Sequence, residues 1–111
     1  MLEDVRLPKT AILGHLGEGF KIAMMGLDGG RIGIAAQACG AGAEAVKYSG
    51  ERVRFGKPIN ANQGLQWYLV DMDIRAGAAW LLTLRAAGLR QEGKPCTTEA
   101  AMAKWYAGEA A

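Results

Sequence analysis

Two oppositely charged residues are spaced by three in the run Asp28-Gly29-Gly30-Arg31. On a helix this spacing places both side chains on one side, about one turn apart. The glycines between them would let another group approach the backbone closely. A carboxylate and a guanidinium arranged in this way could bind a polar ligand together, or they could simply neutralise each other as a local ion pair.

A second candidate group lies in the segment that contains Arg52, Arg54, Phe55, Lys57 and Gln63. A glycine and a proline in this segment predict a turn. Guanidinium groups bind diphosphate oxygens through charge-assisted hydrogen bonds, and a glutamine amide can read an adenine edge. The segment could therefore hold a nucleotide cofactor, and the alternative is a solvated basic loop.

The remaining reactive residue types form no recognisable catalytic or metal-binding arrangement, so we expect neither site in this chain. The one histidine, His15, stands in a glycine-rich turn, where it is expected to be solvated or hydrogen bonded. Cys39 and Cys96 lack metal-ligand spacing and are expected to be reduced thiols. Asp71 and Arg75 are four residues apart, which predicts an exposed ion pair.

Composition narrows the class of protein further. The chain has 111 residues, the length of one domain, and a formal net charge of +2. So weak a charge indicates no nucleic-acid partner. Charged residues interrupt each apolar stretch before the roughly 18 residues that a membrane span needs, so we expect no span. The acidic N-terminus is unlike a targeting sequence, which favours a cytoplasmic protein.

The elements that must position the candidate residues are predicted to be helices. Apolar residues recur every three or four positions between Ile22 and Cys39, which predicts a first helix. Its interior glycines each cost about 1 kcal/mol relative to alanine, so only burial against a neighbour could stabilise it. A long amphipathic helix is predicted from Gln63 to Glu92, with Asn62 as its N-cap.

A Gly-Lys-Pro sequence at residues 93–95 is expected to end that helix, and Thr97 or Thr98 is expected to cap a third helix. Residues 3–14 are predicted to be extended or irregular. Short connections between long helices favour antiparallel neighbours. The predicted fold class is therefore all-α, a partial up-and-down antiparallel bundle with a short extended N-terminal segment.

An ordered set of motifs, covering essentially the whole chain, resembles acyl-CoA dehydrogenases. The motifs are residues 17–24, 27–38, 44–48, 51–52, 55–59 with Gln63, 71–72, 81–82, 85–87, 99–104 and 109. They follow the family's order at nearly the family's spacing. The resemblance implies that residues 1–16 are the end of the middle β-domain and a linker. It implies that residues 17–111 are part of the C-terminal helical-bundle domain.

The family consists of flavoproteins that form an α,β double bond in a fatty acyl-CoA thioester. A glutamate removes the α-proton while the β-hydrogen passes as hydride to the flavin, and the electrons usually leave to an electron-transfer flavoprotein. The resemblance thus implies FAD as cofactor, acyl-CoA as substrate and a homo-oligomer, either a tetramer or a dimer. It implies the cytoplasm in a bacterium or the mitochondrial matrix in a eukaryote.

The resemblance also assigns roles to individual residues. Arg52 would reach the FAD diphosphate, typically that of a neighbouring subunit, and Gln63 would lie at its adenine end. Phe55 would pack against the same cofactor. Asp28 and Arg31 match the family's acyl-CoA contacts near the pantetheine and the thioester.

Several departures from the family pattern limit these assignments. The catalytic glutamate usually follows in a later Tyr-Glu-Gly-Thr segment, and the less common position for a base, near Gly30, holds no base here. Between Gly40 and Glu44 the chain has about four residues fewer than its relatives. Arg54, the remaining candidate cofactor contact, replaces a residue that is commonly Gln or Thr. The family's N-terminal helical domain and most of its middle β-domain, which supply much of the flavin and acyl pocket, are also missing from these residues. Because the base and these domains are missing, we expect the chain alone to be inactive.

Two hypotheses follow from the sequence. The preferred one is a fragment of an FAD-dependent acyl-CoA dehydrogenase, motivated by the ordered motifs. The alternative is a non-enzymatic helical module or degenerate remnant that self-associates through its apolar faces, motivated by the missing base and the shortened first helix.

Overall fold

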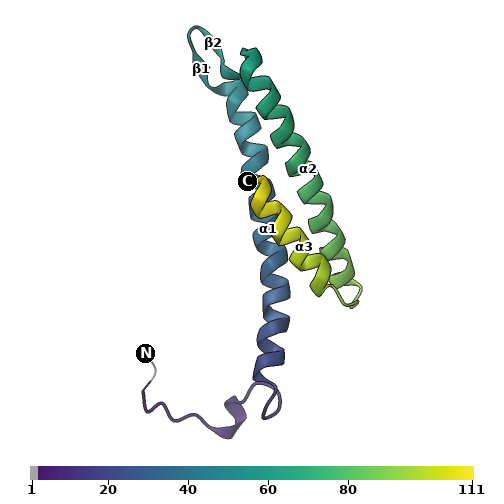
Figure 1. Ribbon diagram of the computed structural model, residues 1–111. Helices are drawn as coiled ribbons and strands as arrows, with labels where there is room; N and C mark the ends of the chain where they lie inside the picture. The colour runs from purple at the N-terminus through teal and green to yellow at the C-terminus, as the bar shows by residue number, and fades with distance from the viewer. Residues whose placement is uncertain (1–2) are drawn as a thin grey trace.

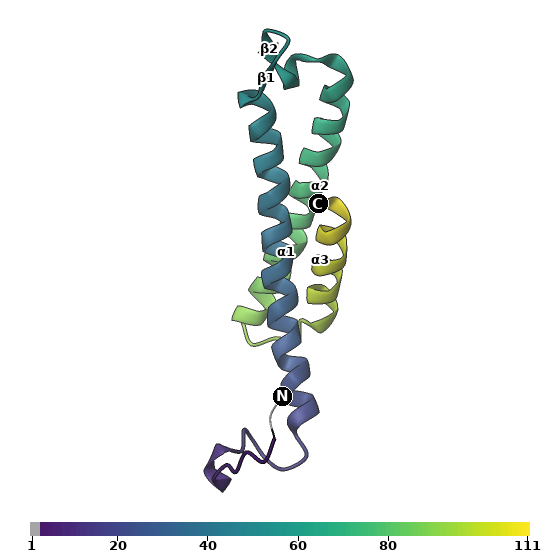
Figure 2. The same cartoon turned by 90° about the vertical axis from the view of Figure 1, so that its left-hand side faces the viewer.

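The computed structural model describes residues 3–111, and 75% of it is helical, which confirms the all-α prediction. Its elements in chain order are η1 (Lys9–Ala11), α1 (Gly19–Glu51), β1 (Val53–Arg54), β2 (Lys57–Pro58), η2 (Ile59–Ala61), α2 (Gln63–Gln91) and α3 (Thr97–Ala110). The helices α1 and α2 run antiparallel along most of their length, and α3 turns back to pack against both (Figure 1 and Figure 2). The arrangement is the expected partial up-and-down bundle.

Helix α1 is continuous over 33 residues, although its glycines disfavour a helix. Gly42 is buried, and a Cβ atom there would lie 3.2 Å from the Cβ of Ala76 on α2. The absent side chain thus permits the two helices to approach closely. Ala35 and Cys39 are also buried on α1. Packing against α2 and α3, which propensity alone does not include, stabilises α1.

The connector between α1 and α2 is a small antiparallel β-hairpin, in which Val53 pairs with Pro58 and Arg54 pairs with Lys57. The two loop residues have positive φ angles, 52° at Phe55 and 80° at Gly56. Two consecutive left-handed residues are the signature of a type I′ turn, whose twist suits a two-residue hairpin loop. The sequence predicted a turn here but no strands.

Helix α2 ends where the sequence predicts. Gly93 has a φ of 69° and donates its N–H to the Arg90 carbonyl at 3.1 Å. The Lys94 N–H reaches the Leu89 carbonyl at 2.9 Å. This pair of bonds is a Schellman motif, which satisfies the last helical carbonyls and requires a left-handed residue, here a glycine.

The predicted side-chain caps at the helix starts are wrong in detail. Asn62 occupies the N-cap position of α2, but its amide donates to the Ile59 carbonyl at 3.0 Å and makes no capping bond. The preceding 3-10 turn places that carbonyl within reach of the amide. Cys96, not a threonine, is the N-cap of α3, and Thr97 is the first residue of the helix.

The core of the described structure consists mainly of alanines. Fully buried positions are Ala35, Ala79, Ala86, Ala100 and Ala103, which bring the three helices together. Among the described residues, no large side chain is fully buried. The molecule measures 67 × 34 × 18 Å, and its radius of gyration is 20.4 Å. A compact chain of this length would have about 13 Å, so the bundle is a thin slab with much of its apolar surface exposed.

The N-terminal segment extends away from the foot of α1 (Figure 1). Residues 3–17 are exposed and mostly irregular, with the single turn of η1, in agreement with the predicted extended or irregular segment. Residues 1 and 2 of the expected N-terminal unit, 1–16, lie outside the described residues. Within residues 3–111, no helix has the length and apolar character required to cross a membrane.

Candidate functional site

The structure pairs Asp28 and Arg31 and adds a third residue to them. Arg31 Nη1 donates to Asp28 Oδ1 at 2.9 Å, as the spacing predicts for a local ion pair. The other carboxylate oxygen, Oδ2, accepts a hydrogen bond of 2.6 Å from the Thr97 hydroxyl at the start of α3. The Asp28 side chain is only 17% exposed. A pair that is local in sequence is therefore also part of the α1–α3 junction.

A pocket of about 490 Å³ opens beside this pair. Its lining combines apolar side chains from the first turns of α1 with the polar group just described: Phe20, Lys21, Met24, Met25, Asp28, Arg31 and Thr97. Apolar walls with a few convergent polar groups are typical of sites for small molecules. The arrangement can hold an apolar chain that carries polar or charged substituents.

The glycines between Asp28 and Arg31 differ in their surroundings. A Cβ atom at Gly29 would lie 2.7 Å from Nη1 of Arg90, so the close approach expected at this glycine is made by a side chain of α2. Nothing lies within 4 Å of the corresponding position at Gly30. Only Gly30 therefore leaves the backbone open to a group from outside the described chain.

The second candidate group lies at the other end of α1, on and beside the hairpin. Phe55 is fully exposed at the tip of the turn, and Arg52, Arg54 and Lys57 are exposed around it. Within residues 3–111, none of these three cations forms an ion pair. Gln63, the first residue of α2, is also exposed. Unpaired guanidinium groups next to an exposed ring fit a ligand that has both phosphates and flat ring systems.

The structure does not bring the two candidate groups together. Arg31 and Arg52 are 21 residues apart on and just after one continuous helix, which corresponds to about 30 Å at 1.5 Å per residue. One molecule of this chain therefore presents two separate surfaces.

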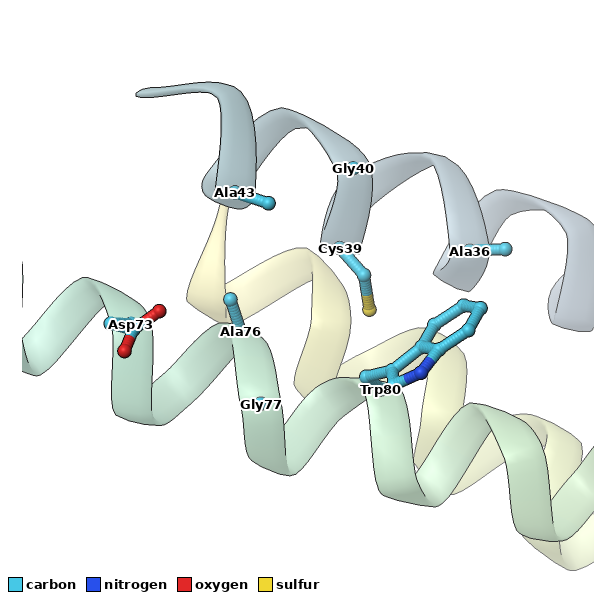
Figure 3. A pocket seen from close by; sticks show the side chains of 8 residues that line it. All are labelled: Ala36, Cys39, Gly40, Ala43, Asp73, Ala76, Gly77 and Trp80. Carbon is cyan, nitrogen blue, oxygen red and sulfur yellow. The ribbon is translucent and has the colours of Figure 1, made fainter. Parts of the chain in front are cut away.

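A third concavity, which sequence analysis did not predict, lies between α1 and α2 (Figure 3). It measures about 530 Å³ and is lined by Ala36, Cys39, Gly40 and Ala43 from α1 and by Asp73, Ala76, Gly77 and Trp80 from α2. The Cys39 thiol and the Trp80 ring both point into the space between the helices (Figure 3). Small residues three or four apart on both helices were the available signal for this groove.

The structure also places the remaining reactive residue types. No group of three or more potential metal ligands occurs among the described residues. The His15 backbone N–H donates to Glu18 Oε2 at 3.0 Å within its turn. Cys39 and Cys96 are free and buried, and Arg75 Nε lies 2.8 Å from Asp71 Oδ2. Arg90 and Thr97 are the residues of the Asp28 cluster that sequence analysis missed, because only the tertiary fold brings them there.

Comparison with known proteins assigns the chain to a family. Residues 17–111 match the model of the acyl-CoA dehydrogenase C-terminal domain. The chain belongs to the acyl-CoA dehydrogenase family. This confirms the family that the motifs predicted.

Individual members of the acyl-CoA dehydrogenase family are similar to this chain throughout. A short-chain-specific acyl-CoA dehydrogenase of Megasphaera elsdenii is 50% identical over 115 residues, which covers 100% of this chain and 30% of the relative. The structure of butyryl-CoA dehydrogenase from the same organism matches with a TM-score of 0.85 and 51% identity over 98% of this chain and 30% of its own.

A further solved structure, described as an electron transferring flavoprotein of Acidaminococcus fermentans, contains a chain with a TM-score of 0.87 and 52% identity. That match covers 100% of this chain and 30% of the other. The chain thus spans about 30% of the length of these similar proteins.

The alignment lengths also bear on the expected shortening of α1. The 115 aligned positions of the Megasphaera relative exceed the 111 residues of this chain by four. The shortening between Gly40 and Glu44 stays a prediction. Helix α1 passes through these positions without interruption.

Proposed function

We propose that this chain is part of an FAD-dependent acyl-CoA dehydrogenase that desaturates a fatty acyl-CoA thioester between its α and β carbons. The observation that carries the proposal is the match of residues 17–111 to the family's C-terminal domain, with the Asp28–Arg31 pair at the edge of a pocket. Residues 17–111 would form part of the C-terminal helical bundle. Residues 1–16 would be the end of the middle β-domain and a linker.

The pocket beside Asp28 and Arg31 suits an acyl-CoA. Phe20, Met24 and Met25 provide apolar contact area, and methionine adapts to chains of irregular shape. The Arg31 guanidinium supplies hydrogen-bond donors that no apolar wall could offer. In the proposed complex these polar residues contact the pantetheine and thioester region, while the open backbone at Gly30 leaves room beside them.

The hairpin suits FAD. Arg52 and Arg54 are exposed and could bind the diphosphate, Phe55 could pack on the cofactor and Gln63 could contact the adenine. When bound, FAD supplies the acceptor for the hydride that leaves the β-carbon. The distance of about 30 Å along α1 between the two surfaces supports the proposal that the hairpin holds the FAD of a neighbouring subunit.

The remaining parts of the proposal concern the whole protein. It would be a homo-oligomer, a tetramer or a dimer, that passes electrons to an electron-transfer flavoprotein. It would lie in the cytoplasm of a bacterium or in the mitochondrial matrix of a eukaryote. The chain itself contributes no catalytic base, so residues 1–111 alone would be inactive, and the base would come from another part of the enzyme.

A second candidate function is a non-enzymatic helical module that self-associates. The thin shape and the exposed Trp67, Leu81 and Trp105 favour it, because exposed apolar surface of this extent promotes association. Such a module would associate without binding flavin.

One experiment separates the two candidates. The whole protein that carries this chain is purified, its flavin absorbance is recorded, and saturated acyl-CoA thioesters of different length are added without an electron acceptor. The enzyme hypothesis predicts bound flavin that is bleached by an acyl-CoA. A well-folded whole protein that binds no flavin after addition of FAD would overturn it in favour of the self-associating module.

A further inference from the structure

The two oxygens of the Asp28 carboxylate accept hydrogen bonds from side chains on two different helices. Oδ2 accepts the 2.6 Å hydrogen bond from Thr97 on α3, and Oδ1 accepts the 2.9 Å bond from Arg31 on α1. Thr97 and Asp28 are 69 residues apart in sequence. The contact is therefore created by the fold, at the point where the α2–α3 turn meets α1.

Arg31 pairs with only one oxygen of the carboxylate. A guanidinium and a carboxylate often form a bidentate pair, in which two N–H groups donate to the two oxygens. Here Oδ2 is engaged by Thr97, and the ion pair uses Nη1 and Oδ1. Arginine has five N–H donors, so donors remain for another acceptor. The Arg31 side chain is 35% exposed and lines the pocket, which makes those donors accessible there.

Thr97 also stabilises the carboxylate without adding charge. A hydroxyl donates one hydrogen bond and is neutral, so the net charge of the Asp28–Arg31 pair stays at zero. The partial positive charge at the start of α3 acts in the same direction, because a helix N-terminus favours a nearby carboxylate. Asp28 is thereby held in one orientation from two sides.

We propose that Thr97 is a positioning residue for the substrate site. Its hydroxyl binds Asp28 Oδ2, so that Arg31 forms a monodentate ion pair with Oδ1. The other N–H groups of the guanidinium then remain directed at the acyl-CoA. Without this hydroxyl, Arg31 closes onto both carboxylate oxygens and withdraws from the ligand. The inference rests on the proposed function, in which Asp28 and Arg31 contact acyl-CoA.

The test uses Thr97→Val in the whole flavoprotein, because valine keeps the shape of threonine and lacks the hydroxyl. Thr98→Val is the matched control: Thr98 is the next residue of the same turn, it is exposed, and it forms no side-chain hydrogen bond within the described chain. Acyl-CoA dissociation constants come from titrations that follow the flavin spectrum, and kcat is measured separately. Thermal unfolding is recorded for each variant.

We expect Thr97→Val to weaken acyl-CoA binding by roughly tenfold, close to the lower limit for loss of one hydrogen bond to a charged group. Its kcat at saturating substrate should change by less than about threefold, because one such bond acts on binding and not on the reacting atoms. Thr97→Ser should restore wild-type affinity, and Thr98→Val should leave it unchanged. In an Asp28→Asn background, Thr97→Val should weaken binding by much less than in the wild type, because the two residues act through one contact.

Other outcomes would refute the proposal in distinguishable ways. If the wild-type flavoprotein binds no acyl-CoA, the proposed function fails, and this inference fails with it. If the wild type binds acyl-CoA but Thr97→Val and Thr98→Val have equal affinities, the proposed function stands and the positioning role is wrong. Loss of affinity in Thr97→Val that Thr97→Ser does not restore, together with a lower unfolding temperature, would show a purely structural role and overturn the inference.

Discussion

Two glycines on α1, Gly40 and Gly42, provide a direct test of how the helices pack. Each Gly→Ala substitution removes backbone freedom from the unfolded chain and should favour the helix by about 1 kcal/mol. Nothing lies within 4 Å of a Cβ at Gly40, so Gly40→Ala should raise the free energy of unfolding by about 0.5–1 kcal/mol. At Gly42 the new methyl group would lie 3.2 Å from the Ala76 Cβ. Overpacking typically costs about 1–3 kcal/mol, so Gly42→Ala should be less stable than Gly40→Ala by about that amount.

The assay is urea unfolding of the whole protein that carries this chain, followed by circular dichroism at several protein concentrations so that subunit dissociation can be separated from unfolding. A double variant, Gly42→Ala with Ala76→Gly, supplies the control, because it restores the space between the helices. It should recover about 1 kcal/mol of favourable coupling relative to the sum of the single changes. If Gly42→Ala is as stable as Gly40→Ala, the close approach of α1 and α2 at this point is wrong.

Three further predictions concern the hairpin, a surface ion pair and the apolar faces. Arg52→Ala in the whole protein should weaken FAD binding by about 1.5–3 kcal/mol, measured by flavin titration. Lys57→Ala on the same hairpin should weaken FAD binding by less. Equal losses of FAD affinity in the two variants would indicate general charge attraction only. Arg75→Ala should change the free energy of unfolding by less than about 1 kcal/mol in urea titrations, because its pair with Asp71 is more than half exposed. The isolated chain should sediment as concentration-dependent oligomers or unfold without cooperativity, and a monodisperse monomer with a sharp transition would contradict this.

The helices could largely be predicted from local pattern. The period of three or four in the apolar residues identified α1 and α2, and the stop at residues 93–95 followed by two threonines indicated α3. Gly93 marked the end of α2, because the left-handed residue of a Schellman motif is usually a glycine. The side-chain caps could not be predicted in the same way. Asn62 had a competing acceptor in the preceding 3-10 turn, and the first residues of α3 faced α1. Whether a side chain caps a helix depends on which hydrogen-bond partner lies nearer to it, and the residue's capping propensity does not contain that information.

At the candidate site, too, some features follow from local sequence and others only from the tertiary fold. The sequence by itself determined the Asp28–Arg31 pair and the exposed cations around Phe55, since both depend on residues that are neighbours along the chain. Only the tertiary structure decided that Thr97 holds the other oxygen of Asp28 and that Arg90 covers Gly29. It also decided that the two candidate surfaces stand at different ends of α1. The physical reason is range: an i,i+3 contact is set by the geometry of one helix turn, whereas contacts between α1, α2 and α3 depend on where small residues allow the helices to meet.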